Sequence, residues 1–276
     1  MTAKLTDYSN LCVHTMTTKH WNLKKCVENY SAAGIYGISI WRNVLEGQKL
    51  KEAKSMLNDH NMTVVSTVRG GFFPSVEKKK REVAIDDNLI AIEQSAAVNS
   101  PLLVLVCGAD ERQPLSTSRE QIKEGILKIL PEAKAAGVKL AIEPLHPMYA
   151  GDRSAINTIA QANDVAEEIN SDFVGVAIDV YHLWWDDKLE PEIKRCGKNG
   201  NLLAFHVCDW NVPTTDFLND RGLMGDGCIN VPQIRGWVEE TGFSGYNEVE
   251  IFSDKYWAID QNQYLEKIKK AYLNHT

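Results

Sequence analysis

The sequence lacks the features that mark several large classes of protein. None of its cysteines stands in a CxxC pair, which argues against a disulfide framework or a zinc ribbon and favours reduced thiols. No apolar run approaches the ~20 residues of a membrane span, and the first residues contain no apolar core of a signal peptide. We therefore expect a cytoplasmic protein with no membrane partner.

Basic residues are in the minority. The chain has 30 lysine and arginine residues against 37 aspartate and glutamate residues, which gives a formal net charge of −7. Binding to a nucleic-acid backbone needs clustered basic side chains. The one dense basic run, 78–81, is flanked by Glu77 and Glu82, and we interpret it as a solvated helix face. A nucleic acid is therefore not an expected partner.

What the chain does contain is a regular alternation of short apolar runs and longer amphipathic stretches. The predicted strands are Leu11–Thr15, Gly37–Trp41, Thr63–Val68, Leu102–Val106, Lys139–Pro144, Val174–Val180, Leu202–Cys208 and Glu248–Phe252. The predicted helices are Trp21–Ala33, Gly47–Asp59, Val76–Ala97, Ser118–Ala136, Ala155–Glu168, Leu189–Arg195, Val231–Glu240 and Gln261–Leu273. Glycines 34, 137 and 242 follow helix ends, and Ser118, Ser154 and Asn230 are expected N-caps.

Eight strands that alternate with eight helices indicate a parallel sheet, and 276 residues suit its closed form. The predicted fold is α/β, a single (β/α)8 TIM barrel that spans residues 1–276. The alternative, an open doubly wound sheet, has no GxGxxG run after any predicted strand to support it.

Side-chain alternation predicts where the polar residues of the barrel converge. In the fifth predicted strand, Leu140 and Ile142 are expected to face the helices, so Ala141 and Glu143 face the barrel axis. Glu248 takes the inward place that alanine has in the other strands. By the same alternation, the last inward-facing residues of the sixth, seventh and eighth predicted strands are polar: Asp179, His206 and Glu250. With Glu143, these side chains should meet at the top of the barrel.

Three carboxylates and an imidazole on one axis would repel one another and lose their hydration if left unpaired. A single divalent cation resolves this, and an oxygen-rich set with one nitrogen suits Mn, Mg, Co or a catalytic Zn. The alternative is a buried salt-bridge network in which Lys139 or Arg69 supplies the counter-charge. Because four strands carry matching polar ends, the metal is the favoured interpretation.

Other polar residues at strand ends are candidates for contact with a substrate: His14, Trp41, Arg69, His146 and His182. His146 follows Glu143 by three residues and His182 follows Asp179 by three, so each is placed to carry a proton or contact a hydroxyl. The alternative for each histidine is an ordinary loop hydrogen bond.

The longest break in the pattern, 209–230, follows the seventh predicted strand, where barrel enzymes place active-site loops. Arg221 in this loop is expected to fold over an anionic or polyhydroxyl substrate. A surface ion pair with Asp220 or Asp226 is the alternative.

Four motifs in this order and spacing resemble the xylose-isomerase-like barrel superfamily of sugar isomerases and epimerases: Ala141-Ile-Glu143-Pro, Ile178-Asp179-Val-Tyr-His182, Phe205-His206-Val and Glu248-Val-Glu250-Ile-Phe. The resemblance implies that Glu143, Asp179, His206 and Glu250 bind one metal, most often manganese. It implies further that the two glutamates act as acid and base, and that His182 and Arg221 contact the substrate.

The expected reaction is proton abstraction beside the carbonyl of a sugar or sugar phosphate, through a metal-stabilised enediolate. The alternative is a lyase that eliminates a β-hydroxyl or a β-linked group. His146 beside the first ligand resembles the base of subunits that act on 3-keto-glycosides. A more remote alternative is a non-catalytic sugar-binding subunit. A related three-zinc DNA-repair endonuclease needs histidines that are missing here. A homo-oligomer and a small partner subunit both remain open.

Overall fold

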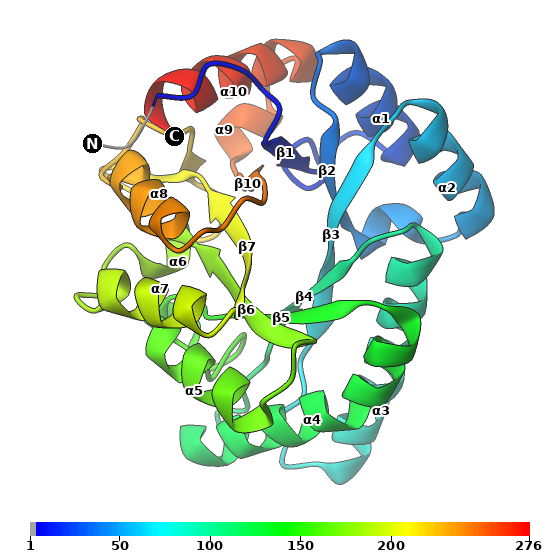
Figure 1. Cartoon of the computed structure of the whole chain (residues 1–276), viewed down its shortest axis with the longest axis vertical. Helices are drawn as coiled ribbons and strands as arrows, with labels where there is room; N and C mark the ends of the chain where they lie inside the picture. The colour runs from blue at the N-terminus through cyan, green and yellow to red at the C-terminus, as the bar shows by residue number, and fades with distance from the viewer. Residues whose placement is uncertain (1–3) are drawn as a thin grey trace.

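Eight parallel strands close into the barrel that the alternating pattern predicts (Figure 1). The computed structural model describes residues 4–276. The strands follow one another round the ring in the order β1-β10-β7-β6-β5-β4-β3-β2, so the first and last meet at a seam. Their bounds are β1 Leu11–His14, β2 Gly37–Trp41, β3 Thr63–Gly71, β4 Leu102–Val106, β5 Lys139–Glu143, β6 Val174–Asp179, β7 Leu202–Val207 and β10 Asn247–Val249.

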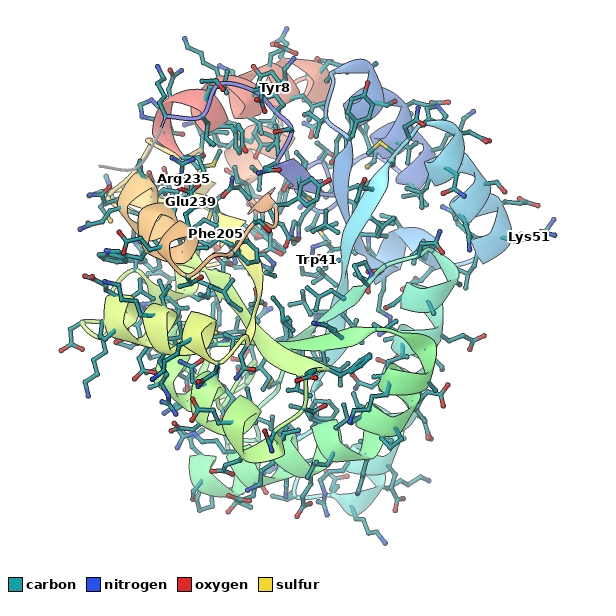
Figure 2. All side chains as sticks on the ribbon, in the orientation of Figure 1. Tyr8, Trp41, Lys51, Phe205, Arg235 and Glu239 are labelled. Carbon is teal, nitrogen blue, oxygen red and sulfur yellow. The ribbon has the colours of Figure 1, made fainter. Side chains whose placement is uncertain are left out.

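Helices surround the ring and cover its outer face (Figure 1). The connecting helices are α1 Leu23–Ala32, α2 Leu50–Asp59, α3 Lys78–Ala97, α4 Leu115–Ala136, α5 Ile159–Ile169, α7 Leu189–Lys198, α8 Val231–Glu240 and α10 Gln261–His275. Figure 2 shows Trp41 near the middle of the ring and Lys51 at the periphery. None of the described helices is both long enough and apolar enough to cross a lipid bilayer.

The predicted side-chain alternation is confirmed in the packing. Leu140 and Ile142 belong to the large cluster between strands and helices. A separate cluster fills the barrel interior, and it consists of Val68, Leu102, Val104, Ala141, Ala177 and Ala204. The inward alanines of β5, β6 and β7 lie in this inner cluster, so the residues that follow them by two also face the axis.

Some boundaries differ from the predictions because local partners outweigh the pattern. Helix α4 starts at Leu115 after Pro114, so Ser118 lies within the helix and is not its N-cap. Ser154 is not a cap either, because the chain from there forms a bridge to Gly108, and α5 begins only after Thr158. The Thr158 side chain accepts a hydrogen bond from the Gln161 N–H. Asn230 caps α8 as predicted.

Several short elements lie beyond the carboxyl ends of the strands and shape the top of the barrel. They are η1 Arg42–Leu45, η2 Pro147–Tyr149, α6 Val180–Leu183 and α9 Asp254–Trp257. Within 209–230, β8 Asp209–Trp210 and β9 Arg221–Gly222 form a two-stranded antiparallel sheet. Asp209 anchors this loop by accepting hydrogen bonds from the N–H groups of Gly225, Gly227 and Ile229. The loop is thereby held over the barrel.

Candidate active site

The four residues that the strand pattern predicts to converge do so. Ligand atoms of Glu143, Asp179, His206 and Glu250 all lie within 4.8 Å of one another, and all four residues are buried. Glu143 and Asp179 end β5 and β6, His206 lies in β7, and Glu250 follows β10 directly. The cluster therefore sits at the carboxyl ends of four strands, where TIM-barrel enzymes place their catalytic residues.

The register of the parallel strands explains the convergence. Asp179 pairs with His206 across β6 and β7. His206 pairs with Glu248 across β7 and β10, and Glu250 is thus one inward position nearer the top than His206. Although Glu250 lies past the end of β10, its N–H still donates to the Val207 carbonyl across 3.2 Å. The side chain is held by the sheet and not by a free loop.

Arg221 supplies the counter-charge to this cluster. Its Nη1 lies 2.9 Å from Asp179 Oδ2 and 3.0 Å from Glu250 Oε2, and all three side chains are buried. The interpretations that placed the counter-charge on Lys139 or Arg69, or placed Arg221 in a surface ion pair, are therefore wrong. The surface ion pair assumed that the loop leaves Arg221 in solvent, whereas the β8–β9 sheet turns it into the barrel.

The crowding of carboxylates shifts the ionisation of the metal-free cluster. Burial raises the pKa of Asp179 to about 7, although the positive charge of Arg221 acts in the opposite direction. Burial would also raise the pKa of Glu250, but His14 and Arg221 outweigh it and hold that pKa well below its ordinary value. For His206, burial is outweighed by the Glu143 hydrogen bond and neighbouring carboxylates, and the pKa rises to about 10.

A polar network lies directly beneath the cluster. Glu248 Oε2 accepts hydrogen bonds from Ser39 Oγ at 2.5 Å and Ser66 Oγ at 2.9 Å, and it lies 3.2 Å from His14 Nε2. The other ring nitrogen of His14 lies 3.1 Å from Glu250 Oε1. The inward position predicted for Glu248 is confirmed, and its carboxylate joins residues of β1, β2 and β3 to β10.

A cavity of about 240 Å³ opens above the cluster. Of the predicted site residues it is lined by Trp41, Arg69, Glu143, His182, Arg221 and Glu250; its other lining residues include Met16, Tyr149, Arg153 and Phe252. Asp179 and His206 lie deeper, with no exposed surface. His14 is equally buried and is not among the lining residues, so the structure places it behind Glu250.

His182 and Arg221 form one unit at the wall of the cavity. The Nη2 atom of Arg221 lies 3.2 Å from His182 Nε2. Burial and the adjacent guanidinium lower the pKa of His182 well below its ordinary value. The imidazole is therefore neutral, and it can accept the hydrogen bond from Arg221.

His146 lies to one side of these residues. Its ring packs against Trp185 and Trp210, with centroids 5.7 and 5.4 Å apart, and its Nδ1 accepts a hydrogen bond from the Met148 N–H. Burial lowers the pKa of His146. This histidine is not among the lining residues of the 240 Å³ cavity.

Two tyrosines that sequence reasoning missed tie the loops together over the cavity. The hydroxyls of Tyr149 and Tyr181 donate to the same carbonyl, that of Phe217, at 2.7 and 3.0 Å. Tyr149 comes from the loop after β5 and Tyr181 from the turn after β6, while Phe217 lies in the loop after β7. Tyr181 lies within the motif Ile178–His182, but neither tyrosine could be given this role from the sequence, because the shared partner is distant along the chain.

Comparisons with known proteins agree with the fold. A family model described as xylose isomerase-like TIM barrel matches residues 27–272. A solved structure of protein SMc04130 from Sinorhizobium meliloti 1021 is 41% identical, with a TM-score of 0.94 over 98% of this chain and 99% of that one. An inosose isomerase from Halalkalibacterium halodurans is 25% identical over 94% of this chain and 93% of its own length. A solved IOLI protein with a binding zinc atom has a TM-score of 0.84 at 21% identity, covering 95% and 96% of the two chains.

Proposed function

The chain belongs to the xylose isomerase-like TIM barrel family, and from this premise we propose that it is a metal-dependent isomerase or epimerase of a sugar or sugar derivative. The observation that carries the proposal is the meeting of three carboxylates and one imidazole within 4.8 Å at the carboxyl ends of four strands. The curated relatives are inosose isomerases and confirm the expected class of enzyme, a carbohydrate isomerase or epimerase. The metal and the mechanism are our proposal.

The residues present fit a divalent cation. Glu143, Asp179, His206 and Glu250 offer oxygen and nitrogen donors from four different strands. Nδ1 of His206 faces the cluster, 3.0 Å from Glu143 Oε1 and 4.0 Å from Glu250 Oε2. A donor set of this composition suits Mn, Mg, Co or Zn, and we propose manganese. A bound divalent ion would polarise a substrate carbonyl and acidify the neighbouring C–H bond.

The two glutamates are placed to move the proton. Glu143 and Glu250 both line the cavity, and they reach it from β5 and from the end of β10. One carboxylate removes the proton beside the carbonyl, and the other returns one to the enediolate. Return to the same carbon from the opposite face gives an epimer, whereas return to the other carbon gives an isomer.

Other lining residues would hold the substrate. The neutral His182 ring and the Arg221 guanidinium lie at one wall and suit hydroxyl and carbonyl oxygens. Trp41 and Phe252 offer apolar surface, with ring centroids 5.3 Å apart, against which the face of a sugar can pack. We propose that His14 acts indirectly, by orienting Glu250 from behind.

The metal content of the purified protein tests the proposal. We expect about one divalent ion per chain by elemental analysis, its removal by a chelator, and its loss in Glu143→Ala. Glu46→Ala is the matched control, because Glu46 is an exposed glutamate outside the cluster. With the metal restored, the protein should exchange a carbon-bound proton of its sugar substrate with deuterated water. A native protein that contains no metal and takes up none from added manganese would overturn the proposal.

A further inference from the structure

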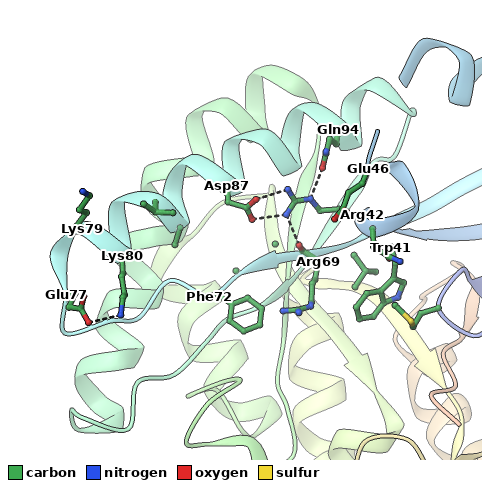
Figure 3. A pocket seen from close by; sticks show the side chains of 17 residues that line it. Trp41, Arg42, Glu46, Arg69, Phe72, Glu77, Lys79, Lys80, Asp87 and Gln94 are labelled. Atoms are coloured by element: carbon green, nitrogen blue, oxygen red, sulfur yellow. Dashed lines mark hydrogen bonds and ion pairs between the residues drawn. The ribbon is translucent and has the colours of Figure 1, made fainter. Parts of the chain in front are cut away.

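Arg69 has an unusual setting at the rim of the candidate active site. The pairing of β3 with β4 shifts between Val68 and Gly70, so Arg69 lies at a bulge. Bulges re-aim side chains, and they are common beside active sites. The guanidinium carbon lies 4.3 Å from the centroid of the Phe72 ring. Figure 3 shows Arg69 between Phe72 and Trp41, apart from the ion pair of Arg42 with Asp87.

The Arg69 guanidinium makes no hydrogen bond or ion pair with the described residues, although the side chain is partly buried and lines the 240 Å³ cavity. Burial lowers the pKa of Arg69, and the positive charge of Arg153 lowers it further. The contact with Phe72 occupies one face of the guanidinium and leaves its N–H edge free. A partly desolvated cation beside a second cation is stabilised by an anion.

Arg153 lines the same cavity, and its positive charge is also poorly balanced by acidic neighbours. Its ion-pair partner is its neighbour Asp152, and Nε is 3.8 Å from that carboxylate. It also lies over the Tyr149 ring, with the guanidinium carbon 5.3 Å from the centroid. Arg69 from β3 and Arg153 from the loop after β5 thus reach the same cavity, and neither has a strong acidic partner.

The sum of the charges at the site also favours an anionic ligand. Glu143, Asp179 and Glu250 carry three negative charges when ionised. A divalent cation together with Arg221 would neutralise them. Arg69 and Arg153 would then remain as two positive charges with no matching negative charge in the lining of the cavity. A phosphate monoester carries about −1.5 to −2 at pH 7, and a carboxylate carries one negative charge.

We infer that Arg69 and Arg153 form an anion subsite, and that the substrate is a sugar derivative with a phosphate or carboxylate group at the end away from its carbonyl. This inference rests on the proposed function for the position of the carbonyl beside the four-residue cluster. The planar guanidinium matches either anion, because it can donate two parallel hydrogen bonds to a pair of oxygens.

A second cavity leads from the subsite to the surface. Figure 3 shows the side chains that line it. It measures about 920 Å³ and shares Met16, Trp41 and Arg69 with the smaller one. Lys79 and Lys80 lie at its far side. Arg69 therefore stands where the two cavities meet. The lining of the larger cavity has four basic residues, Arg42, Arg69, Lys79 and Lys80, against three acidic ones, Glu46, Glu77 and Asp87, so its charge does not repel an anionic substrate that enters by it.

Calorimetric titration with defined probes tests the subsite. The probes are inorganic phosphate, D-fructose 6-phosphate, 5-keto-D-gluconate and neutral D-fructose, at low ionic strength, with chelated and manganese-loaded protein. We expect phosphate to bind the chelated protein, and at least one anionic sugar to bind the loaded protein about tenfold or more tightly than fructose. Arg69→Gln and Arg153→Gln should each weaken anion binding by about tenfold and leave the affinity for fructose unchanged.

Matched controls separate a local effect from a general one. Lys79→Gln removes an exposed charge from the larger cavity only, and it should leave phosphate binding unchanged. Arg69→Lys keeps the charge without the planar fork and should give intermediate affinity. If Arg69→Gln does not fold, Arg153→Gln decides, because Arg153 lies in a surface loop with 38% of its side chain exposed.

Each result is informative. Tighter binding of the phosphate ester or of the keto acid identifies which anion the subsite takes. Absence of phosphate binding at millimolar concentration, or anion binding that survives both glutamine variants, would overturn the inference. Phosphate binding is tested on chelated protein, so the anion subsite can be confirmed even if the protein proves to contain no metal. Failure of the subsite and failure of the proposed function are therefore distinguishable.

Discussion

The guanidinium of Arg221 donates to the buried carboxylate of Asp179 across 2.9 Å, although Asp179 ends β6 and Arg221 lies in β9, beyond β7. The same nitrogen also reaches Glu250. Arg221→Met would leave two buried carboxylates without this partner. In chelated protein we expect a loss of about 3–5 kcal/mol in the free energy of unfolding, measured by urea denaturation.

Added manganese should recover part of that loss, because the ion would supply positive charge to the same carboxylates. Lys49→Met is the control: it breaks a surface ion pair with Glu52, where solvent screens the charges, and its effect should be much smaller. Equal effects of the two substitutions would show that Arg221 does not stabilise the cluster.

Glu143→Gln and Glu250→Gln should each reduce proton exchange of the substrate by about 10²–10⁴-fold. Glutamine keeps the size of the side chain but cannot act as a base, so circular dichroism should remain that of the native fold. Near-normal exchange in either variant would remove that residue from the proton-transfer step.

The stability of chelated protein should fall as the pH rises above about 6.5. The pKa of His206 is raised to about 10 by Glu143 and its neighbours. A raised folded pKa contributes stability that is complete below the unfolded value of about 6.5 and is lost as the pH rises through 10. Asp179, raised to about 7, acts in the same direction at lower pH.

We expect a slope of about 1.4 kcal/mol per pH unit for each proton released, measured by urea denaturation between pH 6 and 10. His206→Asn should flatten the upper part of the profile. A profile that is already flat in the unsubstituted chelated protein would contradict the proposed ionisation of His206.

Gly71, two residues after Arg69 in β3, tests the packing of β3 against β4. A Cβ at this position would meet the Val106 carbonyl oxygen at 1.9 Å, and the backbone φ is +105°. Gly71→Ala should therefore destabilise the protein by more than ~4 kcal/mol. Gly47→Ala is the control: its φ is +70° but no atom lies within 4 Å of the added Cβ, so a loss of about 1–2 kcal/mol is expected. Similar thermal midpoints for the two variants would refute the steric argument.

His146→Ala distinguishes the isomerase from the lyase alternative. Because the His146 ring packs against Trp185 and Trp210, we expect proton exchange to change by less than about tenfold. Loss of turnover with unchanged metal content would instead favour a lyase with His146 as its base. Metal content is measured in parallel by elemental analysis.

The polar ends of the strands were predictable because a strand has a period of two. Once Leu140 and Ile142 were assigned to the helix side, the inward direction of Glu143 followed, and the same reasoning held for Asp179 and His206. The reasoning worked here because the residues in question lie in or beside regular strands.

The parts that escaped prediction depend on contacts between distant segments. The burial of Arg221 depends on how the β8–β9 sheet folds back. The position of His14 behind Glu250 depends on how β1 meets β10 across the barrel seam. The direction of Arg69 depends on a bulge that only the pairing of β3 with β4 reveals. No periodicity along the chain encodes these relationships.

The Glu248 network has a consequence for how the protein is made. One carboxylate oxygen of Glu248, in the last strand of the barrel, contacts His14, Ser39 and Ser66 of the first three strands. During synthesis the first three strands leave the ribosome long before Glu248 does. Until Glu248 is made, the polar groups of these strands lack this hydrogen-bond partner. Ring closure is therefore a late event of biosynthesis, and until then the nascent chain presents an open sheet edge to its surroundings.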